Sequence, residues 1–183
     1  MNHPPTPIAE DDQAGLSSAD HALGPEDAPI TLLEYGDYEC SHCGQAEPKV
    51  RQLVDNFGLQ MRFVFRHLPL LELHPNAELA AEAAEAAAAQ GKFWEMHRLL
   101  FAAQHHLSLH DLTKHAQFIG LDMIRFHGEM ADRIYTQRVQ EHRRAAALSD
   151  VHTTPTFILN GKRIDISAGF EKLEVAALAL KKP

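Results

Sequence analysis

The stretch that decides the fold is ITLLEYGDYECSHC, residues 30–43. Its first part is rich in apolar and β-favouring side chains, which predicts a strand. Its end carries both cysteines of the chain, Cys40 and Cys43, with two residues between them. Apolar residues then recur at helical spacing as far as Phe57, and the glycine that follows is a typical helix stop. The cysteines are therefore predicted to lie where a strand ends and a helix begins.

A second strand follows this helix. Residues 60–66 place three apolar side chains on one side and two arginines on the other, an alternation that is typical of a strand. Residues 30–66 thus read as strand, helix and strand. This order predicts two parallel strands that are joined by a right-handed crossover.

Helical patterns dominate the middle of the chain, over roughly residues 76–148. Asn76 is the expected N-cap of the first helix, which is rich in alanine. Residues 108–111 resemble a capping box and predict a helix start there. The last helix is expected to run unbroken over residues 131–148.

β-Structure returns near the end of the chain. Asn160-Gly161 is a strong hairpin signal and separates two short strand patterns, residues 156–159 and 162–166. A helix over residues 170–180 is expected to close a single α/β domain. We expect a disordered tail over residues 1–17 and a first half of the fold, with the cysteines, over residues 18–67. A helical insertion follows over residues 68–148, and the second half of the fold covers residues 149–183.

Composition argues against several classes of partner. The 183-residue chain has a formal net charge of −8, whereas nucleic acids and anionic membranes attract clustered Lys and Arg. No apolar run is long enough for a transmembrane helix. The first 18 residues lack the basic start and the apolar core of a secretory signal. We therefore expect a cytoplasmic protein, unless a signal has been removed.

The start of a helix makes a thiol nucleophilic. Free N–H groups and the helix dipole favour the thiolate of Cys40, which is the form that attacks disulfides. Cys43 lies further into the helix, so it is predicted to be more buried and to act as the resolving thiol. A protonated His42 between them would favour the Cys40 thiolate further and make the disulfide more oxidising.

Two cysteines in one short window leave few other structural uses. They exclude a stabilising disulfide framework and a four-cysteine zinc site. A redox pair, two inert core thiols, or half of a metal site completed by histidine remain. A Cys-x-x-Cys motif beside a strand–helix–strand unit favours the redox pair.

Further stretches accompany the motif along most of residues 20–180. They are GPEDAP (24–29), EYGDYECSHC (34–43), FRHLPL (65–70) with HPNA (74–77), GKFWEMH (91–97), and VHTTPTF (151–157) with NG (160–161). On these residues the chain resembles the DsbA-like branch of the thioredoxin-fold thiol–disulfide oxidoreductases, a subgroup that is sometimes fused to sodium/proton antiporters. The resemblance implies a thioredoxin fold with an all-helical insertion between its two halves. It also implies disulfide exchange with protein or peptide thiols, and a separate redox partner that resets the dithiol.

The same resemblance assigns roles to individual residues. Glu34 matches a buried acid that moves a proton to or from Cys43. Pro155 matches a cis-proline that faces the dithiol, and Thr154 matches the residue whose backbone pairs with the substrate. Ser41 is expected to contact the substrate as well. Judged by the bare sequence, Glu34 could equally be a solvent-facing strand residue, and Pro155 an ordinary trans proline at a strand start.

Two other functions stay open. A glutathione-dependent isomerase or transferase of the kappa class shares the fold, but that class commonly has a lone Ser or Cys, so Cys43 argues against it. A non-catalytic metal-binding or redox-sensing module could use the same cysteines. Four of the thirteen histidines gather in the helical stretch without a His-Glu-x-x-His motif, namely His105, His106, His110 and His115. We predict neither a bound cofactor nor a metal site.

Overall fold

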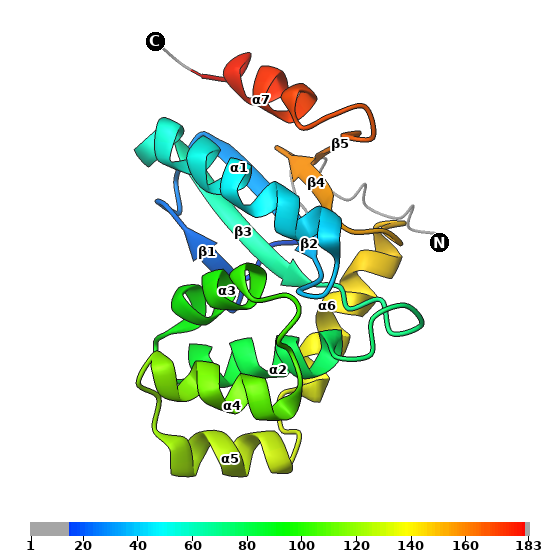
Figure 1. The fold of residues 1–183 in the computed structure, drawn as a ribbon. Helices are drawn as coiled ribbons and strands as arrows, with labels where there is room; N and C mark the ends of the chain where they lie inside the picture. The colour runs from blue at the N-terminus through cyan, green and yellow to red at the C-terminus, as the bar shows by residue number, and fades with distance from the viewer. Residues whose placement is uncertain (1–14, 182–183) are drawn as a thin grey trace, which may run out of the picture.

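The computed structural model describes residues 15–181, which form a five-stranded sheet in the order β1-β3-β2-β4-β5 (Figure 1). The strands are β1 (His21–Leu23), β2 (Ile30–Gly36), β3 (Met61–His67), β4 (Thr156–Leu159) and β5 (Lys162–Ile164). β2 and β3 run parallel, and the other neighbouring pairs are antiparallel. The predicted strand–helix–strand unit and the hairpin after it are confirmed. The short edge strand β1 was not predicted.

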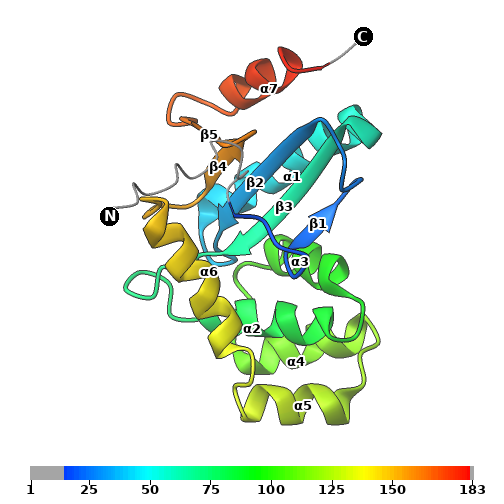
Figure 2. The same cartoon turned by 180° about the vertical axis from the view of Figure 1, so that it is seen from behind.

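Along the chain, helices lie between the strands of this sheet. α1 (Ser41–Phe57) and a short 3₁₀ turn (Gly58–Gln60) connect β2 to β3 and cover one face of the sheet (Figures 1 and 2). The insertion then follows between β3 and β4. Its helices are α2 (Ala77–Ala88), α3 (Phe93–Ala102), α4 (Leu109–Phe118), α5 (Met123–Ala131) and α6 (Thr136–Leu148). α7 (Glu171–Leu178) ends the described chain beside β4. This is the predicted thioredoxin fold with an all-helical insertion.

The prediction of one unbroken helix over residues 131–148 is wrong for its first residues. α5 ends at Ala131, and α6 begins only at Thr136. Between them Arg133 adopts a positive φ of 51°. Its guanidinium donates hydrogen bonds to Glu82 and Glu78 of α2, at 2.6–2.9 Å. The hydrogen bonds of Arg133 to α2 therefore outweigh the local preference of this segment for a helix.

Asn76 is the N-cap residue of α2, as predicted, although its side chain does not cap the helix. The amide nitrogen instead donates to Glu39, whose other carboxylate oxygen accepts from the Asn76 backbone. By contrast, the helix start predicted at Ser108 is confirmed, because its hydroxyl accepts from the backbone of Asp111.

The two central strands are buried almost throughout, and their alternating side chains feed two separate cores. Leu32 and Phe63 face α1 and the helical insertion in the larger core. Leu33 and Val64 face the opposite side, where Ala146 of α6 packs against them. Because Glu34 follows the same alternation as Leu32, its side chain lies on the α1 side of the sheet.

Most of the predicted N-terminal tail, residues 1–17, lies outside the described residues. The carbonyl oxygen of Gly15, the first described residue, accepts a hydrogen bond from Arg66 at 2.8 Å. Across residues 15–181, every helix is too short or too polar to cross a membrane.

Candidate active site

Both cysteines lie at the start of α1, at the end of β2. Cys40 is the residue before the helix, in an extended conformation, and its amide donates to the carbonyl of Asp37 at 3.1 Å. Cys43 sits in the first turn. Both are free thiols. Cys40 keeps 5% of its surface exposed and Cys43 keeps none, so only the first cysteine can meet another molecule.

The surroundings of the two thiols separate their pKa values. A hydrogen bond from the Cys43 thiol, assisted by the backbone amides of Cys43 and His42, lowers the pKa of Cys40 to about 5 against the opposing effect of burial. Burial raises the pKa of Cys43 well above its ordinary value, and the hydrogen bond to Cys40 adds to this. At neutral pH Cys40 is therefore a thiolate and Cys43 a thiol.

A loop from the second half of the fold faces Cys40. The peptide bond between Thr154 and Pro155 is cis, and the carbonyl oxygen of Thr154 lies 3.5 Å from the Cys40 sulfur. His42, Thr154 and Pro155 line one groove, together with residues 163–167. The groove and the Cys40 sulfur are thus joined through Thr154, which contacts both.

Glu34 is a buried acid beneath the dithiol. It is 2% exposed, and its Oε1 atom has no hydrogen-bond partner. Burial raises its pKa to about 8, with further contributions from the negative charges of Glu47 and Cys40. Glu34 and Glu47 both line a cavity of about 140 Å³ beside Trp94. A cavity of that size has room for water, which occupies roughly 30 Å³ per molecule in the liquid.

A side chain of the insertion holds the active-site loop. The Gln104 amide donates to the carbonyl oxygens of Tyr38 and Cys40, at 2.9 and 2.8 Å. Gly44 makes room for it, because a Cβ atom at Gly44 would lie 2.1 Å from the Gln104 oxygen. The role of Gln104 was not predicted, since no motif links position 104 to the cysteines.

Asp37 and Glu39 fix the same loop from its other side. Asp37 is buried and accepts hydrogen bonds from the Leu70 amide at 2.9 Å and from His74 at 2.7 Å. Glu39 is bound by Asn76. The residues just before Cys40 are thus anchored at both ends to the segment that follows β3.

The remaining sequence predictions fall in different places. Ser41 is exposed as the first residue of α1. His67 packs in the interior and bonds to Glu85. His105, His106 and His110 are exposed. Within residues 15–181, neither cysteine belongs to a set of three side chains that could hold a metal ion.

Comparisons with known proteins agree with this geometry. A family model described as Thioredoxin matches residues 16–177. The Na(+)/H(+) antiporter NhaA 1 of Salinispora arenicola is 51% identical over 157 residues, which cover 86% of this chain and 24% of that protein. The Na(+)/H(+) antiporter NhaA of Herminiimonas arsenicoxydans is 41% identical over 145 residues, 79% of this chain and 23% of that protein. The chain thus spans about a quarter of the length of these curated relatives.

Solved structures share the fold at low sequence identity. Oxidised BdbD from Bacillus subtilis superimposes with a TM-score of 0.77 at 22% identity, covering 87% of this chain and 91% of that one. The thiol-disulfide exchange protein alpha-DsbA2 from Wolbachia pipientis gives a TM-score of 0.79 at 21% identity, with coverage of 93% and 91%.

Proposed function

Because the chain belongs to the thioredoxin family and has a DsbA-like fold, we propose that it is a thiol–disulfide oxidoreductase acting on protein or peptide substrates through Cys40 and Cys43. One observation carries this proposal: the two thiols differ in both exposure and pKa. A thiolate that keeps some surface accessible can attack a substrate disulfide, while the fully buried thiol next to it closes the internal disulfide.

In the oxidising direction the cycle begins with a Cys40–Cys43 disulfide. A substrate thiolate attacks the Cys40 sulfur, a mixed disulfide forms, and Cys43 leaves with the electron pair. A second substrate thiolate then attacks the substrate sulfur of the mixed disulfide. This step releases Cys40 as a thiolate and leaves a disulfide in the substrate. Two electrons have moved from the substrate to the dithiol, and a redox partner must remove them before the next turnover.

The low pKa of Cys40 favours this direction. A stable thiolate is a good leaving group, and it stabilises the reduced protein relative to the disulfide. We therefore expect a reduction potential more oxidising than the value of about −270 mV that is typical of thioredoxin. A potential at or below that value, measured against glutathione, would contradict the oxidising role.

Glu34 supplies the proton that Cys43 needs. With a pKa of about 8, the carboxyl group is mostly protonated at neutral pH and is close to its titration point. Its negative form raises the pKa of Cys43, so the two groups interact electrostatically. Glu34 can protonate the leaving Cys43 thiolate and recover a proton through the cavity that it shares with Glu47.

The substrate-binding role falls to the loop that faces the dithiol. Residues 153–155 precede β4, and strand pairing with β2 starts only at Thr156. The Thr154 and Pro155 backbone is therefore available to an extended substrate segment. His42 lines the same groove in the first turn of α1, and Ser41 precedes it as the first residue of that helix.

Trapping the mixed disulfide tests the proposal. A Cys43→Ala variant should accumulate substrate adducts on Cys40, and the Cys40→Ser variant should form none. The wild-type protein should exchange disulfides with insulin and with a dithiol peptide. If neither exchange reaction occurs and the protein conjugates glutathione instead, the kappa-class alternative is supported. A protein without either activity would contradict catalysis through the dithiol.

A further inference from the structure

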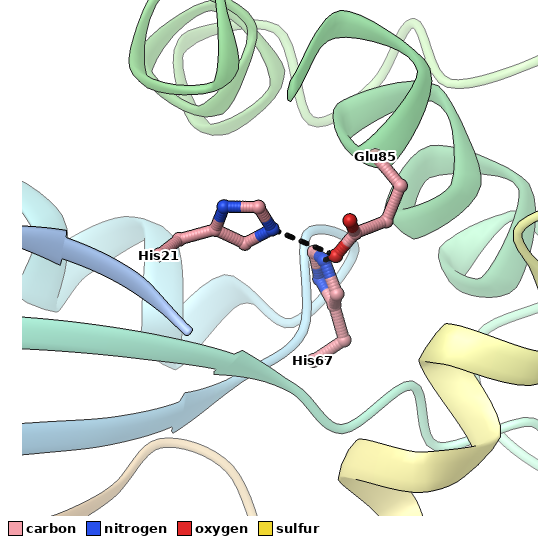
Figure 3. A group of neighbouring side chains, drawn as sticks. All are labelled: His21, His67 and Glu85. Carbon is pink, nitrogen blue, oxygen red and sulfur yellow. Dashed lines mark hydrogen bonds and ion pairs between the residues drawn. The ribbon is translucent and has the colours of Figure 1, made fainter. Parts of the chain in front are cut away.

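Away from the dithiol, three polar side chains converge between the sheet and the insertion (Figure 3). His21 comes from the edge strand β1, His67 from the end of β3, and Glu85 from α2. The Nε2 atoms of His21 and His67 lie 2.9 and 2.8 Å from the same Glu85 oxygen. All three atoms lie within 4.8 Å of one another. Three elements that are distant in sequence thus aim ligand atoms at one point.

Aromatic packing fixes the two imidazole rings. His21 stacks on Phe93 with 3.6 Å between the ring centroids and 12° between the planes. His67 meets the rings of Phe65 and Phe93 at steep angles. His67 is 1% exposed and Glu85 6%. The three groups therefore have little freedom to lose when a ligand binds.

The donor atoms suit a cation. Metal ions bind the neutral form of an imidazole and the ionised form of a carboxylate.

We propose that His21, His67 and Glu85 form a binding site for a divalent transition metal, with Zn²⁺ as the best match. Two imidazoles and one carboxylate are a common ligand set for zinc. Ligand bonds of about 2.0–2.1 Å in a tetrahedron place neighbouring ligand atoms about 3.3 Å apart. The observed separations of 2.8 and 2.9 Å from nitrogen to oxygen need to widen by only about 0.4–0.5 Å. The His21 side chain keeps 15% exposure, through which water can reach the fourth position.

Binding changes the tautomers of the two histidines. Each ring now donates from Nε2 to Glu85, so an ion at Nε2 requires the ring proton on Nδ1. The Nδ1 atom of His67 is buried and has no hydrogen-bond partner. Histidine ligands usually donate that proton to an acceptor, and loss of such a partner weakens a site about 10–100-fold. We therefore expect a site that is weaker by about that factor than one with a complete outer shell.

The site would act as a cross-link. Its ligands join the sheet edge and the end of β3 to α2 of the insertion. An ion that binds only the folded chain stabilises it by mass action. The same insertion holds the active-site loop through Gln104, although metal binding does not depend on disulfide exchange by the cysteines.

Zinc binding to the reduced, full-length chain tests the proposal. We expect about one Zn²⁺ per chain in competition with a chromophoric chelator, and a thermal midpoint that rises with zinc. His21→Ala and Glu85→Gln should each weaken binding at least about tenfold and abolish the thermal shift. Cys40→Ser/Cys43→Ser and His106→Ala/His110→Ala are matched controls that should bind zinc as the wild type does.

Two readouts on the wild-type chain avoid reliance on the variants. Bound Co²⁺ should show ligand-field bands without a thiolate charge-transfer band. Nitrogen NMR should show that Zn²⁺ shifts the Nε2 signals of two histidines. The proposal is overturned if the wild type binds no zinc. It is equally overturned if binding persists in His21→Ala and Glu85→Gln but disappears in the double cysteine variant.

Discussion

Replacement of Cys43 tests the asymmetry on which disulfide exchange depends. The hydrogen bond from the Cys43 thiol is the largest cause of the low Cys40 pKa. A hydrogen bond to a charged group is worth about 1.5–3 kcal/mol, and one pKa unit corresponds to about 1.4 kcal/mol. Cys43→Ala should therefore raise the Cys40 pKa by about 1–2 units, from about 5 to about 6–7. The thiolate fraction at about pH 6 would fall from about nine-tenths to between a half and a tenth.

The assay follows the thiolate by its ultraviolet absorbance and by the rate of alkylation with iodoacetamide as the pH is varied. Cys43→Ser is the matched control, because its hydroxyl can still donate to the Cys40 sulfur. In Cys43→Ser the pKa of Cys40 should lie between its values in the wild type and in Cys43→Ala. An unchanged pKa in Cys43→Ala would refute the role of the thiol and leave the helix amides as the cause. A wild-type pKa near the free value of about 8.5 would refute the whole assignment.

Three further predictions concern stability. Glu34, with its raised pKa, makes a contribution to the stability of the reduced protein that is fully present below about pH 4.5 and is lost as the pH rises toward about 8. Glu34→Gln should remove this loss and exceed the wild type by about 3 kcal/mol at pH 7 in urea unfolding, and parallel pH profiles would contradict a buried, protonated acid. Gly44→Ala should be destabilising because of Gln104; adding Gln104→Ala should recover part of the loss, and a double-mutant cycle without coupling would contradict the contact. Arg133→Ala should destabilise the protein by removing its bonds to Glu82, by about 1–3 kcal/mol in thermal unfolding because the carboxylate is buried, whereas a change within about 0.5 kcal/mol would mean that the pair is not needed.

Features with a local cause could be predicted from the sequence. β2 and α1 follow from apolar spacing, and the turn at Asn160 and Gly161 follows from their preference for positive φ, at 45° and 77°. The position of the dithiol was therefore accessible, because it depends on where a strand ends and a helix begins. The cis bond before Pro155 was expected only through the family resemblance, since local sequence favours trans.

Features that depend on distant partners could not be predicted. β1 has three residues and exists because it pairs with β3, so it carries no usable periodicity. The break at Arg133 requires Glu82 on another helix. Gln104 reaches the dithiol from 64 residues away. In each case the decisive contact is created by the fold, and the residue types at the two positions carry no mark of it.

The insertion belongs to the active site because its side chains hold the loop that carries Cys40. The low Cys40 pKa needs backbone amides in fixed positions at the start of α1, since a mobile loop would let water replace them. Gln104 binds the carbonyl oxygens of Tyr38 and Cys40. Asp37 and Glu39 tie the same loop to the segment between β3 and α2. A chain reduced to the bare sheet and α1 would keep both cysteines and lose these constraints. It should therefore have a higher Cys40 pKa and a less oxidising disulfide.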